Sequence, residues 1–355
     1  MTTDVVVIGG GPAGSASAIR LAGIGMRVTL YEKARFPRPK LCGGFLSPDA
    51  LPELQALGVW DAVKSGGGSF VRRAVIQSRQ GTAAETRLPA LAYSLSREEL
   101  DALLLDRARA AGVAVYEGVD GFARREPAGW TVVASGRGPV FGPRGSLSAA
   151  RSFLMDPYFG IQAFFDDTAG IRDQVELDIL SDHYVGLVRQ GQGRTNVCAL
   201  VTQTFLREQG PSLDKALRAL MNLHPPLNNH LRAARRVSAW QSAGPVLIGR
   251  RRLINDRTFY VGDAACVVDP FSGEGIAMGL HGARILSEAF RQGGPVAETY
   301  ARQWEKNLGS LLRMQRLARV TLEAAPFQNA VLRGFKALPS TLGWLAAKTR
   351  LPVAS

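Results

Sequence analysis

The chain opens on a run of apolar, mostly β-branched residues that leads directly into a glycine-rich turn. Residues 5–8 read Val-Val-Val-Ile, residues 9–14 read Gly-Gly-Gly-Pro-Ala-Gly, and residues 15–23 have the apolar spacing of a helix. A second apolar stretch, residues 27–31, ends at Glu32. This order predicts a strand, a helix and a second strand, a βαβ unit with the Gly-x-Gly-x-x-Gly spacing of a dinucleotide-binding fingerprint.

Each glycine of this fingerprint has its own physical reason. Gly9 permits the tight turn, Gly11 lets the backbone approach a pyrophosphate, and Gly14 lets helix and strand pack closely. The free N–H groups and the positive dipole end at the helix N-terminus favour phosphate groups. Glu32 lies 18 residues beyond Gly14, where a carboxylate accepts hydrogen bonds from a ribose. The sequence therefore predicts a protein that binds a dinucleotide.

Farther along the chain, the spacing of apolar residues changes from helical to an alternation of apolar and polar residues. Four segments between residues 158 and 202 alternate as strands do, which predicts an antiparallel sheet, and residues 121–141 have the pattern of a β-hairpin. From Ile276 onward the chain is mostly helical in pattern. Helices are also expected over residues 51–63, 97–111 and 213–223, and short strands over 113–116 and 258–261.

We therefore predict an α/β protein in which a Rossmann-like nucleotide-binding domain is interrupted by an antiparallel-sheet substrate domain and followed by a helical C-terminus. The nucleotide-binding domain is predicted over residues 1–75, 94–150 and 250–300, the substrate domain over 76–93 and 151–249, and the helical region over 301–355.

The composition bears on the cellular compartment and on the charge of the partners that we expect. Hydrophobic residues make up 46% of the 355 residues, enough for a sizeable core. The three cysteines show no disulfide framework or zinc spacing, which favours a reducing compartment, and we expect a cytoplasmic protein, peripheral at the membrane. The net charge of +13 favours acidic partners or an anionic surface. No nucleic-acid motif accompanies this charge, and no two histidines have a metal-ligand spacing, so neither nucleic acid nor a metal is expected.

A second signature follows the predicted strand at 258–261. Residues 262–276 place Asp263 after the strand and a Gly-rich helix start, Pro-Phe-Ser-Gly-Glu-Gly-Ile, at 270–276. With the opening motif, this resembles the FAD-binding signature of the para-hydroxybenzoate hydroxylase-like flavoproteins. The 270–276 segment and the loop 40–44, Lys-Leu-Cys-Gly-Gly, are most similar to the geranylgeranyl reductase branch. Arg97, four residues before an aspartate, is similar to that family's FAD-contacting arginine.

The resemblance implies FAD as the resident cofactor, with NAD(P)H as a transient electron donor or a separate reductase in its place. Glu32 would hold the adenosine ribose, Arg97 would lie near the pyrophosphate or ribityl chain, and Asp263 would contact both. The residues implied to bind the cofactor are Gly9, Gly11, Pro12, Ala13, Gly14, Glu32, Lys33, Lys40, Cys42, Gly43, Arg97, Gly262, Asp263, Gly273, Gly275 and Ile276.

Three residues are candidates for catalysis. Cys42 lies in a Gly-flanked loop expected near the flavin, where a thiol is redox-active or shapes the pocket, and a small buried residue is the alternative. His183 and Tyr184 are expected on a strand facing the substrate cavity, as proton donors. His224 and His230 fall in a Pro/Asn-rich segment and are expected to be exposed loop residues, whereas His281 is expected to pack within a helix.

The chain departs from the family pattern in two places. The mid-chain Ala-Asp-Gly-x-x-Ser motif has its nearest match at residues 142–148, with Arg144 where the acid stands in the family. The segment 183–188 lacks the Trp and Pro of the Tyr-x-Trp-x-Phe-Pro segment of geranylgeranyl reductases. Trp240 stands alone, without the Trp-x-Trp-x-Ile-Pro pattern of halogenases, which disfavours halogenation.

Three functions stay open at this point. The first is a geranylgeranyl-reductase-like enzyme that reduces a C=C bond of an apolar, isoprenoid or polyketide-type substrate. The second is a flavin-dependent monooxygenase that hydroxylates an aromatic or polyketide substrate, and the third is a non-catalytic flavin-binding electron carrier. Between residues 302 and 350, nine basic residues and two acidic ones give a net charge of +7, interleaved with apolar residues. This pattern fits an anionic membrane surface, an acidic carrier protein, or a helix that packs on the core.

Overall fold

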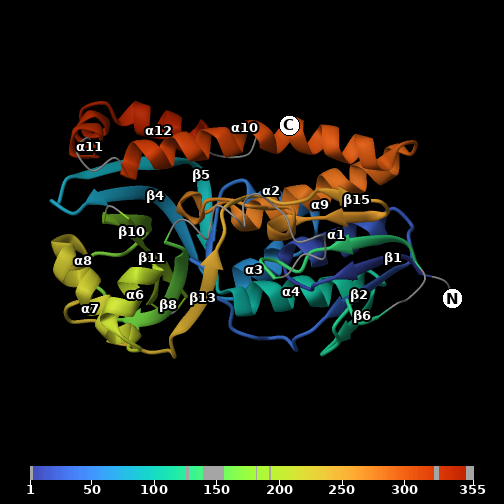
Figure 1. Cartoon of the computed structure of the whole chain (residues 1–355), viewed down its shortest axis with the longest axis horizontal. Helices are drawn as coiled ribbons and strands as arrows, with labels where there is room; N and C mark the ends of the chain where they lie inside the picture. Colours follow the sequence, from blue (N-terminus) through green and yellow to red (C-terminus); the bar gives the residue numbers. More distant parts are fainter. Residues whose placement is uncertain are drawn as a thin grey trace.

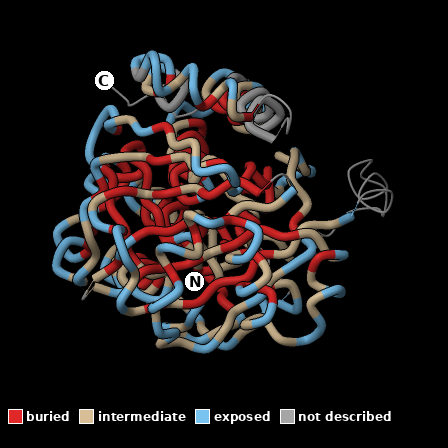
Figure 2. The backbone as a smooth tube through the Cα atoms, turned by 90° about the vertical axis from the view of Figure 1, so that its left-hand side faces the viewer, coloured by how far each residue is buried: buried red, intermediate tan, exposed pale blue. Residues whose placement is uncertain are grey.

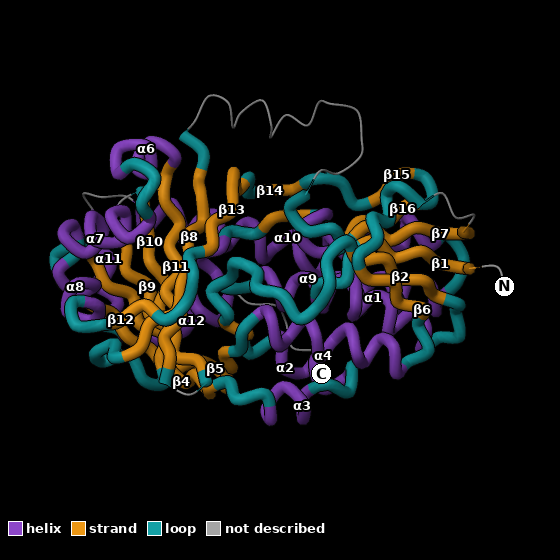
Figure 3. The backbone as a smooth tube through the Cα atoms, turned by 90° about the horizontal axis from the view of Figure 1, so that it is seen from below, coloured by secondary structure: helices purple, strands orange, loops and turns teal. Residues whose placement is uncertain are grey.

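Two sheets, each with its own helices, organise the chain (Figure 1). The computed structural model describes residues 3–124, 128–138, 156–180, 182–191, 193–323 and 328–348. Six strands form one sheet in the order β15-β16-β7-β1-β2-β6, and a second sheet has the order β12-β8-β11-β10-β9-β4-β5-β3. Seen from below, the two sheets occupy opposite ends of the molecule, and loops lie between them (Figure 3). The predicted α/β class is confirmed.

The six-stranded sheet is mostly parallel and carries the opening motif. Strand β1 (Thr3–Ile8) pairs in parallel with β2 (Val28–Glu32) on one side and with β7 (Ala128–Val133) on the other. β6 (Ala114–Glu117) and β16 (Thr258–Tyr260) extend the sheet in parallel, and β15 (Ile254–Asn255) closes one edge antiparallel. Helices α1 (Pro12–Gly23), α4 (Arg97–Ala110) and α9 (Gly275–Gln292) pack on this sheet in one apolar core.

The β-hairpin expected over residues 121–141 is wrong. Within the described part of this segment, β7 is a single strand inserted between β1 and β16, parallel to both. Val132 and Val133 are buried there, so this apolar stretch is a central strand rather than one arm of a hairpin. The segment 142–148, with Arg144, lies outside the described residues.

The second sheet contains the antiparallel segments expected between 158 and 202. They are β8 (Tyr158–Asp166), β9 (Gln174–Leu180), β10 (His183–Gln190) and β11 (Arg194–Thr202). β4 (Ser69–Ser78) and β5 (Ala83–Ser94) also belong to this sheet, which β4 joins by pairing in parallel with β9. The shorter strands are β3 (Phe45–Leu46), β12 (Arg235–Arg236) and β13 (Gln241–Val246).

Three short helices cover one face of this sheet: α6 (Gln203–Gln209), α7 (Leu213–Leu223) and α8 (Pro225–Leu231). The expectation of exposed loop histidines is wrong here. His224 is fully buried and caps the N-terminus of α8, where its Nδ1 accepts a hydrogen bond from the Leu227 N–H. His230 lies on α8, with its Nε2 2.8 Å from a carboxylate oxygen of the buried Glu176.

The pair between His230 and Glu176 predicts a pH-dependent stability. The Glu176 carboxylate raises the pKa of His230 from 6.5 to about 9. Because the folded-state pKa is above the unfolded one, this contribution is complete below about pH 6.5 and is lost as pH rises through about 9. We expect the free energy of unfolding, measured by urea denaturation, to fall more steeply between pH 7 and 9 than in His230→Gln. Parallel slopes in the two proteins would contradict the assignment.

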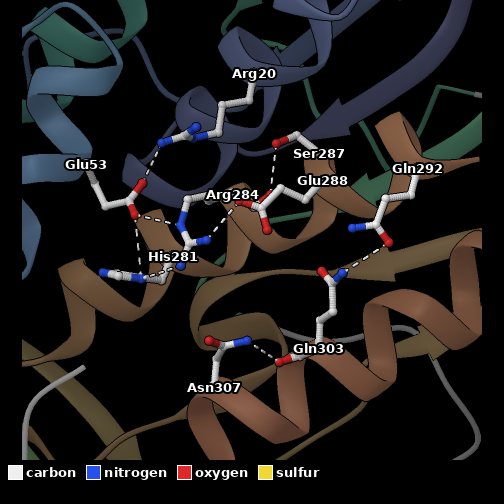
Figure 4. Close-up of polar contacts among 9 residues, drawn as sticks. All are labelled: Arg20, Glu53, His281, Arg284, Ser287, Glu288, Gln292, Gln303 and Asn307. Carbon is white, nitrogen blue, oxygen red and sulfur yellow. Dashed lines mark hydrogen bonds and ion pairs between the residues drawn. The ribbon is translucent and has the colours of Figure 1, made fainter. Parts of the chain in front are cut away.

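Helices also fill the space between and above the sheets. The helix expected over 51–63 is two helices, α2 (Ala50–Ala56) and α3 (Trp60–Ser65), because Gly58 adopts a φ of +71° between them. Glu53 on α2 accepts hydrogen bonds from Arg20 on α1 and Arg284 on α9 (Figure 4). His281 lies within this network, buried against the Asp49 carbonyl, so the prediction that it packs is confirmed.

The helical C-terminus lies across one side of the molecule, over β4 and β5 (Figure 1). It contains α10 (Val296–Glu323), α11 (Gln328–Ala337) and α12 (Pro339–Lys348). The first half of α10 is a core helix, because Tyr300, Trp304 and Leu308 are buried against the six-stranded sheet's core. Buried residues concentrate in the sheets and beneath these helices (Figure 2).

Candidate active site

A cavity between the two sheets brings most of the predicted site residues together. The six-stranded sheet contributes the turn after β1 and the segment after β16, and the second sheet contributes the inner face of β8, β10 and β11. The predicted residues that line it are Gly11, Pro12, Ala13, Lys40, Cys42, Gly43, Arg97, Tyr184, Gly262, Asp263, Gly273, Gly275 and Ile276.

The turn after β1 is closed so tightly that only glycine fits at two positions. Gly9 has a φ of +107°, and a Cβ there would lie 2.5 Å from the Ala134 carbonyl oxygen. A Cβ at Gly14 would lie 1.8 Å from the Gly9 carbonyl oxygen. Gly11 is the N-cap of α1 and Pro12 its first residue, so the free N–H groups of the helix start face the cavity. This is the geometry expected for a phosphate site.

The second motif packs directly on the first. A Cβ on Gly262 would lie 2.8 Å from the Ala13 Cβ, so these two turns approach as closely as their backbones allow. The loop 40–44 continues into β3, where the Phe45 ring lies against Gly273, and Ser47 donates a hydrogen bond of 3.1 Å to the buried Glu274. These contacts fix the start of α9 at the cavity, where its positive dipole end favours negative charge.

Arg97 stands over the phosphate turn. Its Nη2 would lie 3.5 Å from a Cβ on Gly11, and the guanidinium makes a bidentate ion pair with Asp101, at 2.7 Å from Nε and 2.6 Å from Nη2. Burial alone would lower the pKa of Arg97, but the Asp101 carboxylate outweighs burial and raises it. Arg97 is therefore a fixed positive charge, held at the start of α1.

Lys40 lines the same cavity, and its pKa depends on the charges around it. Arg97 first, and burial second, lower the pKa of Lys40 from 10.5 to about 8. Two cationic side chains so close together fit a ligand that carries more than one negative charge, as a pyrophosphate does.

A pH dependence of FAD binding follows from this lowered pKa. An anionic pyrophosphate favours the charged amine, so we expect FAD affinity to be constant below about pH 7 and to fall as pH rises through about 8. Lys40→Met should bind FAD about tenfold more weakly at pH 7, without this pH dependence. Fluorescence titration of the apoprotein with FAD measures both, with the exposed Lys306→Met as control. An unchanged pH profile in Lys40→Met would show that another group titrates.

Glu32 lies beside the cavity wall rather than in it. Its carboxylate accepts hydrogen bonds from the Gly10 N–H at 2.7 Å and the Ala34 N–H at 2.9 Å, and it is 5% exposed. Arg38 Nη2 lies 4.0 Å from the same carboxylate. Lys33, the next residue, is exposed and is not among the described residues that line the cavity. A role of Glu32 at the ribose stays a prediction.

We expect Glu32→Ala to weaken FAD binding about tenfold to a hundredfold. A charge-assisted hydrogen bond contributes roughly 1.5–3 kcal/mol, and the change also releases the Gly10 amide of the phosphate turn. Glu32→Gln keeps an acceptor for the Gly10 amide and removes the charge. Comparing the two variants therefore separates the loss of support for the phosphate turn from the loss of the charged contact to the ribose. FAD affinity equal to wild type in both would show that Glu32 does not contact the cofactor.

The three catalytic candidates separate in the structure. Cys42 and Tyr184 line the cavity, and the Cys42 Sγ accepts a hydrogen bond of 3.3 Å from the Gly44 N–H. His183 is not among the described cavity residues, and its ring centroid lies 4.7 Å from that of Phe205 on α6. The expectation that His183 faces the cavity is wrong, because neighbouring residues on a strand point to opposite faces.

Two ionisable residues among those that line the cavity, Cys198 and Arg137, were not predicted from the sequence. Cys198 projects from β11, whose Asn196 donates a hydrogen bond of 2.9 Å to the Cys42 carbonyl, so the two thiols line one cavity. Burial first, and Cys42 second, raise the pKa of Cys198 to about 12. Arg137 lies after β7, and its carbonyl oxygen accepts a hydrogen bond of 3.3 Å from Arg251 Nη2. Alternation along β11 was the signal available for Cys198.

The comparisons with known proteins bear on this site. Residues 2–137 match the family model described as an FAD binding domain. The chain is 27% identical to menaquinone reductase of Mycolicibacterium smegmatis, over 90% of this chain and 86% of that protein. It is 28% identical to digeranylgeranylglycerophospholipid reductase 2 of Methanopyrus kandleri, over 88% and 85% of the two chains.

The fold is similar to that of a solved flavin-dependent enzyme. The structure of the flavin-dependent brominase Bmp2 aligns with a TM-score of 0.79 over 98% of this chain and 94% of that chain, at 18% identity. The chain is an FAD-dependent oxidoreductase, and its fold is similar to that of this flavin-dependent brominase. The FAD-binding signature found in the sequence is thereby confirmed.

The residues present fit FAD in this oxidoreductase. The glycine turn leaves the α1 amides open, Arg97 and Lys40 supply positive charge beside them, and the start of α9 faces the same cavity. Among the described residues, no group of three His, Cys, Asp or Glu side chains is arranged to hold a metal ion. None of the helices in the described ranges has the length and apolar character to cross a membrane.

Proposed function

We propose that this oxidoreductase reduces a C=C bond of an apolar, isoprenoid-like substrate. The observation that carries the proposal is the character of the cavity wall opposite the FAD motifs. Leu200 and Val246 line it, and they belong to an apolar cluster with Val267 and Tyr184. The near full-length relatives named as reductases of menaquinone and of digeranylgeranylglycerophospholipid support an apolar polyprenyl substrate.

Reduction of an isolated C=C bond needs a hydride at one carbon and a proton at the other. FAD, when bound and reduced, supplies the hydride. The chain offers two proton donors on the sheet side of the cavity, the Tyr184 hydroxyl and the Cys198 thiol. With a pKa of about 12, Cys198 keeps its proton at neutral pH. The apolar residues packed around Tyr184 would exclude water and hold a hydrocarbon chain against it.

NAD(P)H is our proposed electron donor, binding transiently at the cavity mouth. The support is the single βαβ fingerprint of the chain, which the FAD accounts for. Anaerobic stopped-flow reduction of the FAD-loaded protein by NADPH and by NADH, followed by flavin absorbance, tests the donor. Flavin that stays oxidised with both would favour a separate reductase.

The decisive experiment removes oxygen. The FAD-loaded protein, reduced with dithionite under anaerobic conditions, is mixed with menaquinone or with digeranylgeranylglycerophospholipid, and the product is analysed by mass spectrometry. We expect a gain of two hydrogens per reduced C=C bond, which persists after any quinol is reoxidised in air, together with reoxidation of the flavin. Product that carries added oxygen and forms only in air would replace this proposal by a monooxygenase. Flavin that exchanges electrons with neither substrate, with or without air, would favour an electron carrier.

A further inference from the structure

The C-terminal helices carry exposed apolar and basic side chains. Leu338 is 61% exposed at the junction of α11 and α12, and Trp344 on α12 is 57% exposed. Arg333 and Lys336, on α11, are exposed as well. These four residues are called the C-terminal patch below.

The patch has no role in the protein's own core. Leu332 and Leu342, on the same two helices, are 0% and 3% exposed and pack with Ala84 and Ile179 of the sheet beneath. They provide the apolar contact that holds α11 and α12 in place. Leu338 and Trp344 are therefore available to a partner outside the chain.

The segment that carries the patch has charges of one sign. From residue 324 to the end, the sequence has four basic residues, Arg333, Lys336, Lys348 and Arg350, and no acidic residue. An anionic surface meets no repulsion from this segment, and each basic residue adds attraction that salt screens. Tryptophan and leucine beside lysine and arginine are the combination that enters the headgroup region of a bilayer.

We propose that the C-terminal patch docks this protein on an anionic lipid bilayer. Trp344 and Leu338 enter the headgroup region, and Arg333 and Lys336 contact the lipid phosphates. A bilayer fits these side chains better than a protein partner does, because two apolar side chains that stand out by more than half their area match a deformable layer. The proposal does not depend on the substrate.

The patch is also linked to the cavity through the fold. The apolar cluster under α11 and α12 includes Phe271, which lies between the cavity-lining residues Pro270 and Gly273. Docking through the patch would therefore place the bilayer on the side of the molecule from which this cluster leads to the cavity wall. An apolar substrate dissolved in the bilayer would then lie close to the cavity.

The test is co-sedimentation of the FAD-loaded full chain with vesicles of phosphatidylcholine, with and without phosphatidylglycerol, at low and high salt. We expect binding to the anionic vesicles at low salt and about tenfold weaker binding for Arg333→Glu/Lys336→Glu. Leu338→Ser/Trp344→Ser should weaken binding at both salt concentrations, because apolar insertion resists salt. Retained flavin absorbance shows that the variants are folded.

The matched control reverses two charges on another face. Lys215 and Arg218 are exposed on α7, which lies on the opposite side of the second sheet from α11 (Figure 1). Lys215→Glu/Arg218→Glu should bind vesicles as wild type does. The proposal fails if wild type does not bind anionic vesicles at low salt, or if the control weakens binding as much as the patch variants do. Binding of an acidic carrier protein through the patch, without vesicle binding, would equally overturn it.

Discussion

Gly14→Ala is expected to destroy the FAD site and to destabilise the whole nucleotide-binding sheet. The new Cβ would lie 1.8 Å from the Gly9 carbonyl oxygen and 3.2 Å from the Ala134 Cβ. The first contact is with backbone, so no side-chain rotation relieves it, and the turn must move away from α1. Overpacking of this kind costs typically about 1–3 kcal/mol. The α1 amides then no longer converge on a pyrophosphate, so the purified variant should carry no FAD.

Thermal unfolding and flavin absorbance measure the two effects separately. We expect a fall in Tm of roughly 2–10 °C and a colourless protein that excess FAD does not reconstitute. Gly23→Ala is the matched control at the end of the same helix, where a Cβ meets nothing within 4 Å. It should be neutral or slightly stabilising, because alanine loses less backbone entropy than glycine. A yellow Gly14→Ala protein with wild-type Tm would show that the turn is not closed as described.

The local motifs were predictable because their physics is local. The opening strand, turn and helix follow from apolar spacing and from glycines that the turn itself requires at Gly9 and Gly14. Helix α7 has the predicted bounds, because Ser212 caps its N-terminus and a proline pair follows Leu223.

That same proline pair explains a failure. Two consecutive prolines after His224 indicated a loop, yet prolines are tolerated in the first turn of a helix, and α8 begins with them. Once the helix forms, His230 lies on the side of the helix that faces the sheet, where it pairs with Glu176. The burial of His224 and the pairing of His230 with Glu176 on β9 depend on where this helix lies, which no local pattern encodes.

Contacts between segments far apart in the chain could not be predicted from the sequence either. β7 lies between β1, whose paired residues stand 125 positions earlier in the chain, and β16, whose paired residues stand 127 positions later. Apolar composition does not say which neighbours a strand takes. Glu32 has the right spacing for a ribose, but only the structure shows that the Gly10 amide occupies part of its carboxylate. Cys198 comes to the cavity because β11 lies beside the loop that carries Cys42.

Arg97→Met is expected to lower both the stability of the protein and its affinity for FAD. A second substitution can show how much of each loss comes from the broken ion pair. Asp101 is 1% exposed, and Arg97 is its bidentate partner. Removing the guanidinium leaves a buried carboxylate without its counter-charge, which costs about 3–5 kcal/mol. The same change removes the fixed positive charge over the Gly11 turn. The single variant should therefore lose both stability and FAD.

The double variant Arg97→Met/Asp101→Leu separates these two consequences. Replacing a buried ion pair by apolar residues of similar volume is often neutral or stabilising, so urea denaturation should show most of the lost stability restored. FAD affinity should not be restored, because the positive charge beside the pyrophosphate is still missing, and we expect it to stay at least about tenfold below wild type. Asp101→Leu alone is the control that keeps the guanidinium. Recovery of FAD affinity together with stability in the double variant would mean that Arg97 only supports the fold and does not contact the cofactor.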